Sequence, residues 1–313
     1  MSLAAFDLAA FAAAKGADRA DRAAALDRIC RETGFVVLTG HGVDAAIIAR
    51  QWEAVRRFFA QPPEAKQAVA PAQGAPYGYL GPDREALARS RGVDTPPDLK
   101  ESFSGRPAQE APPGADTTAR AFMTAPTPWP DLPGFRDAWE GYYAALEDLA
   151  ARIMVAFAEA LSLPSDHFAP VHQNPISALR ALHYPATGEI AAGDQQRAGA
   201  HTDYGTLTIL LPQAGSSGLQ IRQGDDWVDV TAPPDAFVIN IGDLMARWTA
   251  DRWVSTLHRV VARSHQPARL SLAFFLQPDW FAEIAPLDGS DIYPPVASGP
   301  YLMQKFQAAA GTS

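Results

Sequence analysis

The spacing of apolar residues predicts three helices in the first half of the chain. Over 18–33, 45–60 and 135–157, apolar side chains recur every three or four residues, as they do on the buried face of a helix. Gly34 follows the first segment and Pro164 follows the third, and both residue types commonly end helices. We therefore expect three scaffold helices whose apolar faces pack against a common core.

Beyond residue 176 the pattern changes to short β-rich runs separated by turn residues, chiefly Gly, Pro and Asp. These runs span 177–184, 206–211, 219–222, 227–230, 237–241, 258–262 and 270–276. Many short strands at such a spacing are typical of a sandwich or jelly roll. An apolar run at 35–38 predicts one more short strand, directly after the first helix. The pattern therefore favours a mostly β fold with flanking α-helices.

The segment from about residue 70 to 130 is rich in Pro, Gly and Ala and shows little periodicity. A loop of this length inside a compact domain is usually functional or mobile. We therefore expect residues 1–130 to form an N-terminal helical region with loops suited to substrate contact. Residues 131–313 would hold the long helix and the β-rich domain, and the two parts would form one compact unit.

The composition is that of a globular protein. Of the 313 residues, 47% are apolar and 19% are charged, which allows a sizeable core and disfavours disorder. The net charge of −9 and the lack of any Lys/Arg cluster argue against nucleic acid as a partner. The one cysteine, Cys30, cannot form an intramolecular disulfide, and its helical setting predicts a core position.

Two patterns bear on location. Charged residues interrupt the Ala-rich N-terminus before the apolar segment of a signal peptide can form. No stretch approaches the ~20 apolar residues of a membrane helix. We therefore expect a cytoplasmic protein with no membrane partner, and the sequence leaves its oligomeric state open.

The candidate chemistry begins with an imidazole and a carboxylate two residues apart, in His201-Thr202-Asp203. Residues i and i+2 of an extended chain face the same side, so both groups can reach one ion while Thr202 points away. His258 begins a later predicted strand and offers a second imidazole. Two His and one carboxylate on one face of an octahedral ion leave three positions open, as in non-haem Fe(II) oxygenases. A solvated loop is the alternative interpretation of the His-x-Asp pair alone.

A second candidate feature is Arg269-Leu270-Ser271, whose alternation directs a guanidinium and a hydroxyl toward the same side of a predicted strand. A charged Arg inside a β-barrel needs an anionic partner. No Asp or Glu occurs in 268–276, so a ligand carboxylate held by the guanidinium is an economical partner. An Arg at the surface of a strand edge is the alternative.

Together with further motifs along almost the whole chain, these residues give a sequence that resembles the isopenicillin N synthase-like family of Fe(II)/2-oxoglutarate-dependent dioxygenases. In the N-terminal part the resemblance is carried by Gly34-Phe35, His41-Gly42-Val43, Pro63-Glu64-Ala65-Lys66 and Asp98-Leu99-Lys100-Glu101-Ser102-Phe103. In the C-terminal half it is carried by Arg180 to Pro185, Gly199-Ala200-His201-Thr202-Asp203, Gly242-Asp243, Ser255-Thr256-Leu257-His258-Arg259-Val260 and Arg269-Leu270-Ser271.

The resemblance implies a distorted double-stranded β-helix (jelly roll) core with an N-terminal helical region. It also implies that His201, Asp203 and His258 are the catalytic residues and hold Fe(II). Arg269 and Ser271 would then grip the distal carboxylate of the cosubstrate 2-oxoglutarate.

Two further residues match positions near the cosubstrate in this family. Tyr184 matches a tyrosine that often contacts it, and Arg180 matches an arginine found there in some bacterial members, although a buried structural Arg180 is an equal alternative. The chain departs from the Asn-Tyr-Tyr-Pro of many plant members in Leu182-His183-Tyr184-Pro185, so the Asn contact is absent. His183 should face away from Tyr184 and be structural.

The activity implied is oxidative decarboxylation of 2-oxoglutarate to succinate and CO2, with O2 hydroxylating a bound small-molecule substrate. Loops at 74–106 and 187–199, with Phe275 and Gln277, are the expected substrate contacts. Two alternatives remain. One is an oxidase of the same fold, isopenicillin N synthase-like or ascorbate-using, that consumes no 2-oxoglutarate. The other is a non-catalytic binding module that contains a metal.

Overall fold

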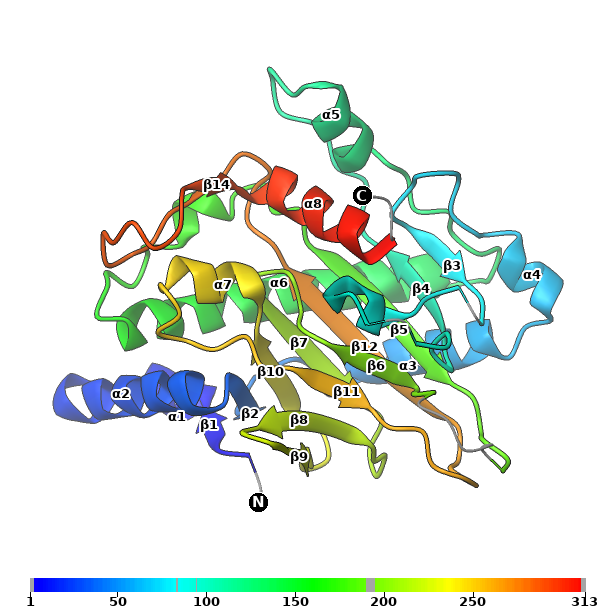
Figure 1. The fold of residues 1–313 in the computed structure, drawn as a ribbon, viewed down its shortest axis with the longest axis horizontal. Helices are drawn as coiled ribbons and strands as arrows, with labels where there is room; N and C mark the ends of the chain where they lie inside the picture. The colour runs from blue at the N-terminus through cyan, green and yellow to red at the C-terminus, as the bar shows by residue number, and fades with distance from the viewer. Residues whose placement is uncertain (1–2, 83, 94, 190–194, 311–313) are drawn as a thin grey trace.

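An eight-stranded sheet forms the largest layer of the fold (Figure 1). The computed structural model describes residues 3–82, 84–93, 95–189 and 195–310. All neighbouring strands of this sheet are antiparallel except β1 and β2. In spatial order they are β1 (Ala5–Asp7), β2 (Phe35–Thr39), β10 (Phe237–Ile241), β7 (Leu207–Pro212), β12 (Arg269–Leu276), β5 (Ala178–Tyr184), β4 (Glu101–Gly105) and β3 (Gly78–Leu80).

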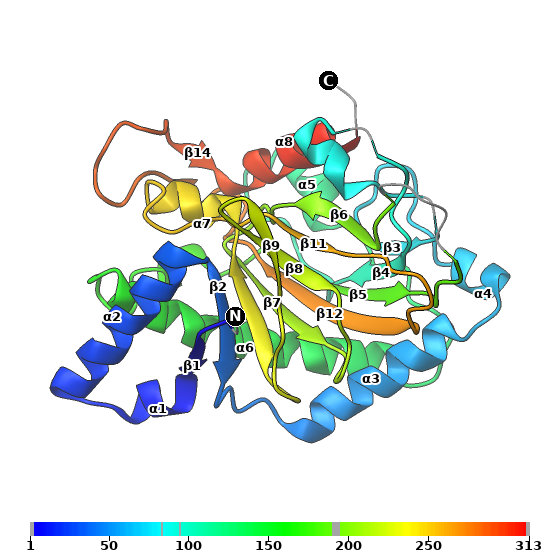
Figure 2. The same ribbon diagram turned by 60° about the horizontal axis from the view of Figure 1, so that its bottom comes forward.

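A second, four-stranded sheet covers one face of the first (Figure 2). Leu182 and Val238 of the large sheet share one buried apolar cluster with Ile221 and Val260 of the small sheet. Two sheets packed around a common core make the jelly roll that the sequence predicted, and the strands expected beyond residue 176 are confirmed. The small sheet has the order β6 (Ala198–His201), β11 (His258–Val260), β8 (Leu219–Gln223) and β9 (Asp226–Asp229), and a separate pair is β13 (Glu283–Ile284) with β14 (Val296–Ala297).

The three helices that the apolar spacing predicted are confirmed as α2 (Gly16–Glu32), α3 (Ala45–Phe59) and α6 (Phe135–Ala160). Helices α3 and α6 lie on the face of the large sheet that points away from the small sheet (Figure 2). The remaining helices are α1 (Leu8–Ala13), α4 (Pro63–Gln67), α5 (Thr117–Met123), α7 (Asp243–Trp248), α8 (Ser298–Ala310) and the short 3-10 turns η1 (Leu87–Arg91) and η2 (Ala169–Val171). Cys30 of α2 is fully buried in this helical core, as expected.

Strand alternation divides the large sheet into a structural face and a functional face. On β12, Phe274 points outward, where its ring centroid lies 5.2 Å from that of Tyr143 on α6. Ser271 and Ala273 point inward and line a cavity between the two sheets. Because successive side chains alternate, a strand such as β12 contributes both to the core and to the cavity wall.

The segment 70–130 is more regular than its composition predicts, since it contains β3, η1, β4 and α5. Strand β4 escaped prediction because a buried polar residue breaks its apolar pattern. The Glu101 carboxylate accepts hydrogen bonds from Lys66 Nζ at 2.7 Å and Tyr79 OH at 2.5 Å. His183 Nδ1 lies 2.6 Å from the other Glu101 oxygen, on the face of β5 opposite Tyr184, so the expectation for His183 is confirmed.

This buried cluster makes folding stability depend on pH. Burial alone would raise the pKa of Glu101, but hydrogen bonds from His183, Lys66 and Tyr79 outweigh it and lower the pKa to about 2. A carboxyl with a depressed folded-state pKa stabilises the fold above its unfolded pKa and loses this contribution as the pH falls toward the folded value.

We therefore expect wild-type protein to lose about 3 kcal/mol more unfolding free energy than Glu101→Gln between roughly pH 5 and pH 2. Urea denaturation across this pH range measures the difference. Parallel pH profiles for the two proteins would show that Glu101 is not the titrating group.

The C-terminal helix α8 closes one side of the fold. It packs against η1, and its Leu302, Met303 and Phe306 side chains line the cavity between the sheets. Among the described residues, none of the helices is long and apolar enough to cross a membrane.

Candidate active site

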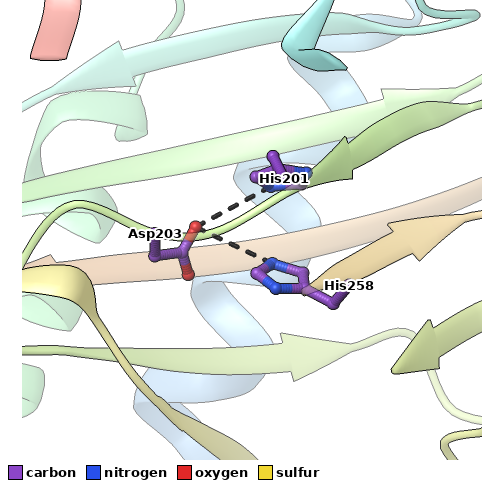
Figure 3. Close-up of side chains that lie close together, drawn as sticks. All are labelled: His201, Asp203 and His258. Carbon is purple, nitrogen blue, oxygen red and sulfur yellow. Dashed lines mark ion pairs between the residues drawn. The ribbon is translucent and has the colours of Figure 1, made fainter. Parts of the chain in front are cut away.

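The His201, Asp203 and His258 side chains converge on one point (Figure 3). All three line the inter-sheet cavity. His201 ends β6 and His258 begins β11, and the two residues are directly opposed in the antiparallel pair. The Nε2 atoms of both imidazoles lie 3.8 Å from Asp203 Oδ1. One ligand atom from each residue lies within 4.8 Å of the others, so the three groups could hold a single metal ion. The structure therefore brings together the three residues that the sequence singled out.

Hydrogen bonds fix the orientation of both imidazoles. His201 Nδ1 lies 2.7 Å from Gly199 O, and His258 Nδ1 lies 3.0 Å from Thr256 O. A backbone carbonyl can only accept, so each Nδ1 carries the proton and each Nε2 keeps its lone pair free. Both lone pairs then face Asp203, which is the arrangement a metal ion requires.

Asp203 is fixed in the same way. Its Oδ2 accepts hydrogen bonds from Thr208 Oγ1 at 2.6 Å and from Asn240 Nδ2 at 2.7 Å, which leaves Oδ1 for the side facing the imidazoles. Thr208 and Asn240 are directly opposed on β7 and β10. Thr202, expected to point away, also borders the cavity, because β6 ends at His201 and strict alternation is lost beyond it.

The electrostatics of His201 and Asp203 favour a bound cation. Burial is the largest cause that lowers the pKa of His201, and the neighbouring His258 lowers it further. Burial would raise the pKa of Asp203, but the charges of His258 and His201 and the two hydrogen bonds to Oδ2 lower it. A neutral imidazole and an ionised carboxylate are the forms that bind a metal.

Removing one of the hydrogen bonds to Asp203 should weaken metal binding without removing a ligand. We expect Thr208→Val to lower the affinity for Fe(II) by about 10-fold, because partners that orient a ligand typically contribute 10- to 100-fold. Thr206→Val is a matched control, since the buried Thr206 hydroxyl has no hydrogen-bond partner. Anaerobic Fe(II) titration of both variants measures the effect, and equal affinities would contradict the role of Thr208.

The cavity has a volume of about 570 Å3. The four remaining predicted residues also line it, namely Arg269, Ser271, Tyr184 and Arg180. Arg269 is only 4% exposed. Its Nη1 donates to Ser217 O at 2.8 Å and its Nη2 to Ser271 Oγ at 3.1 Å, while its Nε is buried without a partner. The guanidinium carbon lies 4.9 Å from the centre of the Tyr184 ring.

No carboxylate of the described residues pairs with Arg269 in a salt bridge. Burial consequently lowers its pKa, since a desolvated charge without a counterion is unfavourable. Arg269 therefore has no anionic partner either on its own strand or among the described residues packed around it, and an anionic ligand would provide one.

Three further charged side chains line the cavity, namely Glu85, Lys100 and Arg180. Arg180 Nη2 lies 2.6 Å from both carboxylate oxygens of Glu85, and Lys100 Nζ lies 2.8 Å from Asp98 Oδ2 and 3.5 Å from Glu85 Oε2. Burial would raise the pKa of Glu85, but the charges of Arg180 and Lys100 lower it to about 2. The charge of Arg180 is thus matched within the protein, unlike that of Arg269.

Sequence reasoning missed several residues that shape this site. The spacing of Thr208 from Asp203 in the sequence does not indicate that the two side chains are in contact. Asn240 offered one signal, because it is the lone polar residue in the apolar strand Phe237–Ile241. Asp98 begins one of the motifs that carry the family resemblance, but the sequence did not indicate its contact. Its Oδ1 accepts a hydrogen bond from Gly199 N at 2.9 Å.

The expected substrate-contact segments lie partly on the cavity wall. Phe275 and Gln277 line it, as do several residues between 74 and 106, including Tyr77 and Leu80. From 187–199 only Ala198 lines it among the described residues, and 190–194 lie outside the described part of the chain. The aromatic side chains of Tyr77, Phe122 and Phe306 line the same cavity as the triad.

A jelly roll that presents two imidazoles and a carboxylate beside a cavity defines the class of non-haem iron oxygenases. Comparison with known proteins agrees. Residues 175–278 match the model of the 2OG-Fe(II) oxygenase superfamily, and residues 3–132 match the N-terminal model of non-haem dioxygenases in morphine synthesis.

Several relatives match most of the length of this chain. A validamycin A dioxygenase of Streptomyces hygroscopicus subsp. limoneus is 34% identical over 90% of this chain and 78% of its own. A homoarginine-6-hydroxylase of Arabidopsis thaliana is 30% identical over 90% of this chain and 87% of its own. The crystal structure of a full-length Neurospora crassa protein in complex with alpha-KG and thymine has a TM-score of 0.83 at 28% identity, covering 99% of this chain and 97% of that chain.

The chain therefore belongs to the 2OG-Fe(II) oxygenase superfamily. It is an Fe(II)- and 2-oxoglutarate-dependent oxygenase that acts on a small molecule, and the predictions of fold class, enzyme class, cofactors and small-molecule partners are confirmed. The relatives named as 2-oxoglutarate-dependent dioxygenases favour this function over the same-fold oxidase and over the non-catalytic binding module.

Proposed function

We propose that His201, Asp203 and His258 hold the Fe(II) of this oxygenase. The observation that carries the proposal is the convergence of two Nε2 atoms and one carboxylate oxygen within 4.8 Å, each turned inward by a hydrogen bond on its other atom. This donor set suits Fe(II), because nitrogen and oxygen ligands on one face leave positions for cosubstrate and O2.

In the same proposal, Arg269 and Ser271 bind the distal carboxylate of 2-oxoglutarate, and Tyr184 contacts the cosubstrate beside them. The buried Arg269 Nε without a partner, the hydroxyl of Ser271 at 3.1 Å from Arg269 Nη2, and the absence of a protein carboxylate among the described residues support this assignment. Arg269 and Tyr184 are directly opposed on β12 and β5, so both reach one end of the cavity.

Arg180 is proposed as a cosubstrate contact, with a structural ion pair to Glu85 as the alternative. It lines the cavity, and its Nε is buried without a partner although Nη2 is occupied by Glu85. It precedes Tyr184 by four residues on the same face of β5, about 13 Å along the strand, and therefore stands away from the distal-carboxylate end.

When bound, iron and 2-oxoglutarate supply the oxidising chemistry that turns 2-oxoglutarate and O2 into succinate, CO2 and a hydroxylated product. The chain orients the cosubstrate through Arg269, holds the substrate over the triad, and excludes water from the cavity. Apolar and aromatic side chains from η1, α5 and α8 surround the substrate end of the cavity, which suits a substrate with an apolar body.

The decisive experiment adds candidate small molecules to the protein under anaerobic Fe(II) and 2-oxoglutarate and monitors the metal absorption band. A true substrate should shift the band and, once O2 is admitted, yield one succinate per product. Product without succinate would favour the same-fold oxidase instead. A protein that binds Fe(II) but consumes no O2 with any substrate would favour the binding module.

We also propose three finer assignments. Membership of the isopenicillin N synthase-like branch is supported by the motifs that carry the family resemblance. A cytoplasmic location is supported by the charged residues that interrupt the Ala-rich N-terminus, and cell fractionation tests that location.

Residues 1–130 and 131–313 should unfold as one unit, because β2 and β4 pair with β10 and β5 across that boundary. Two separate transitions in thermal unfolding would contradict a single unit.

A further inference from the structure

Arg197 is a second buried arginine close to the proposed cosubstrate site. It immediately precedes β6 and is only 1% exposed. Its Nη2 donates to Pro185 O at 2.9 Å and to Pro267 O at 2.6 Å, and its Nε is buried without a partner. No carboxylate of the described residues pairs with it in a salt bridge, so its charge is unmatched within that part of the protein.

The two carbonyls that Arg197 contacts belong to the strand ends that carry the cosubstrate residues. Pro185 directly follows Tyr184 at the end of β5, and Pro267 stands shortly before Arg269 at the start of β12. Tyr184 and Arg269 are themselves directly opposed. One guanidinium therefore ties together the two backbone segments that set the positions of Arg269 and Tyr184.

Arg197 and Arg269 also interact as like charges. Burial is the largest cause that lowers the pKa of Arg197, and the nearby charge of Arg269 lowers it further. Two buried cations without a protein counterion destabilise each other unless an anion binds between or beside them. A carboxylate at Arg269 would offset one of the two positive charges and so relieve the repulsion between them.

We infer that Arg197 is a positioning residue for the distal carboxylate of 2-oxoglutarate. It fixes the strand ends that carry Arg269 and Tyr184, and its charge adds to the attraction for the anion. This inference rests on the proposed function of Arg269. It predicts a selective loss of cosubstrate affinity when Arg197 is replaced, with the metal site unaffected.

Three substitutions separate charge from hydrogen bonding. Arg197→Lys keeps the charge, Arg197→Gln keeps a donor without the charge, and Arg197→Met removes both. The matched control is Arg263→Gln, which removes an exposed arginine paired with Asp229 at 3.5 Å. Anaerobic titration of each Fe(II)-loaded protein with 2-oxoglutarate, followed by the metal absorption band, gives the dissociation constant without turnover.

We expect Arg197→Gln and Arg197→Met to bind 2-oxoglutarate about 10-fold or more weakly than wild type, and Arg197→Lys to recover most of the loss. Fe(II) affinity should stay within about twofold in all variants, and KM for 2-oxoglutarate should rise while kcat changes little. The wild-type preference for 2-oxoglutarate over 2-oxobutyrate, which lacks the distal carboxylate, should fall in the Gln and Met variants.

Unchanged 2-oxoglutarate affinity in a folded Arg197→Gln protein would overturn the inference and leave the proposed function intact. Equal losses in the Lys and Gln variants would overturn the contribution of charge. If Arg197→Met fails to fold, the Lys and Gln variants still decide the question. If wild type itself gives no 2-oxoglutarate-dependent band, the proposed function fails, and this inference fails with it.

Discussion

Replacing His201 with alanine is expected to abolish Fe(II) binding and turnover. The substitution removes one of three ligand atoms that lie within 4.8 Å of one another, and no other His, Cys, Asp or Glu of the described residues joins this cluster to replace it. Loss of a ligand should exceed the 10- to 100-fold loss typical for residues that only orient one, so we expect affinity to fall by more than about 100-fold.

Anaerobic Fe(II) titration and succinate release measure the two consequences separately. Asp203→Asn should behave like His201→Ala, because it keeps the shape of the side chain and removes its negative charge. His167→Ala is the control, since this histidine lies outside the cavity, its ring packed edge-on against Phe168. Full activity of the His201 variant would show that the ligand assignment is wrong.

Replacing Arg269 with alanine should chiefly raise the requirement for 2-oxoglutarate. A bidentate guanidinium–carboxylate contact comprises two charge-assisted hydrogen bonds, each contributing about 1.5–3 kcal/mol. Their loss corresponds to roughly a 100-fold or greater rise in the dissociation constant of 2-oxoglutarate. Affinity for Fe(II) alone should stay near that of wild type, because Arg269 contacts none of the three proposed ligands in the hydrogen bonds it makes.

The comparison with Arg269→Lys and Ser271→Ala sharpens this test. Lysine keeps the charge but cannot form the planar two-point contact, so an intermediate affinity is expected. Ser271→Ala removes one hydroxyl and should have the smallest effect. Wild-type affinity for 2-oxoglutarate in Arg269→Ala, measured from the absorption band, would contradict the assignment of this arginine.

The predicted elements correspond to segments whose burial follows a simple period. Helix α6 buries Trp139, Leu146 and Ile153 on one side, and the spacing of such residues is visible without a structure. The strands that form the jelly roll likewise appear as short apolar runs. Elements that bury polar side chains were not predicted. The main example is β4, where Glu101 is buried against Lys66.

The proposed metal site was predictable because each residue carries a local signal. His201 and Asp203 stand two positions apart, and His258 begins a strand, so residue type and short spacing drew attention to all three, although strand alternation does not extend past His201. Arg269 was predictable because no acidic residue stands near it on its strand. Arg180 was less clear, because only the fold shows that Glu85, from a distant loop, matches its charge.

The sequence by itself determined the kinds of element, the jelly-roll class and the residues with the chemistry of an iron site, because periodicity and residue type act over short stretches of chain. Only the tertiary structure decided which distant groups stabilise those residues. Asn240 reaches Asp203 across 37 positions, and Arg197 reaches Pro267 across 70. Such contacts depend on the register and packing of the strands. A pattern within a short stretch of sequence cannot predict which distant residues this packing brings into contact.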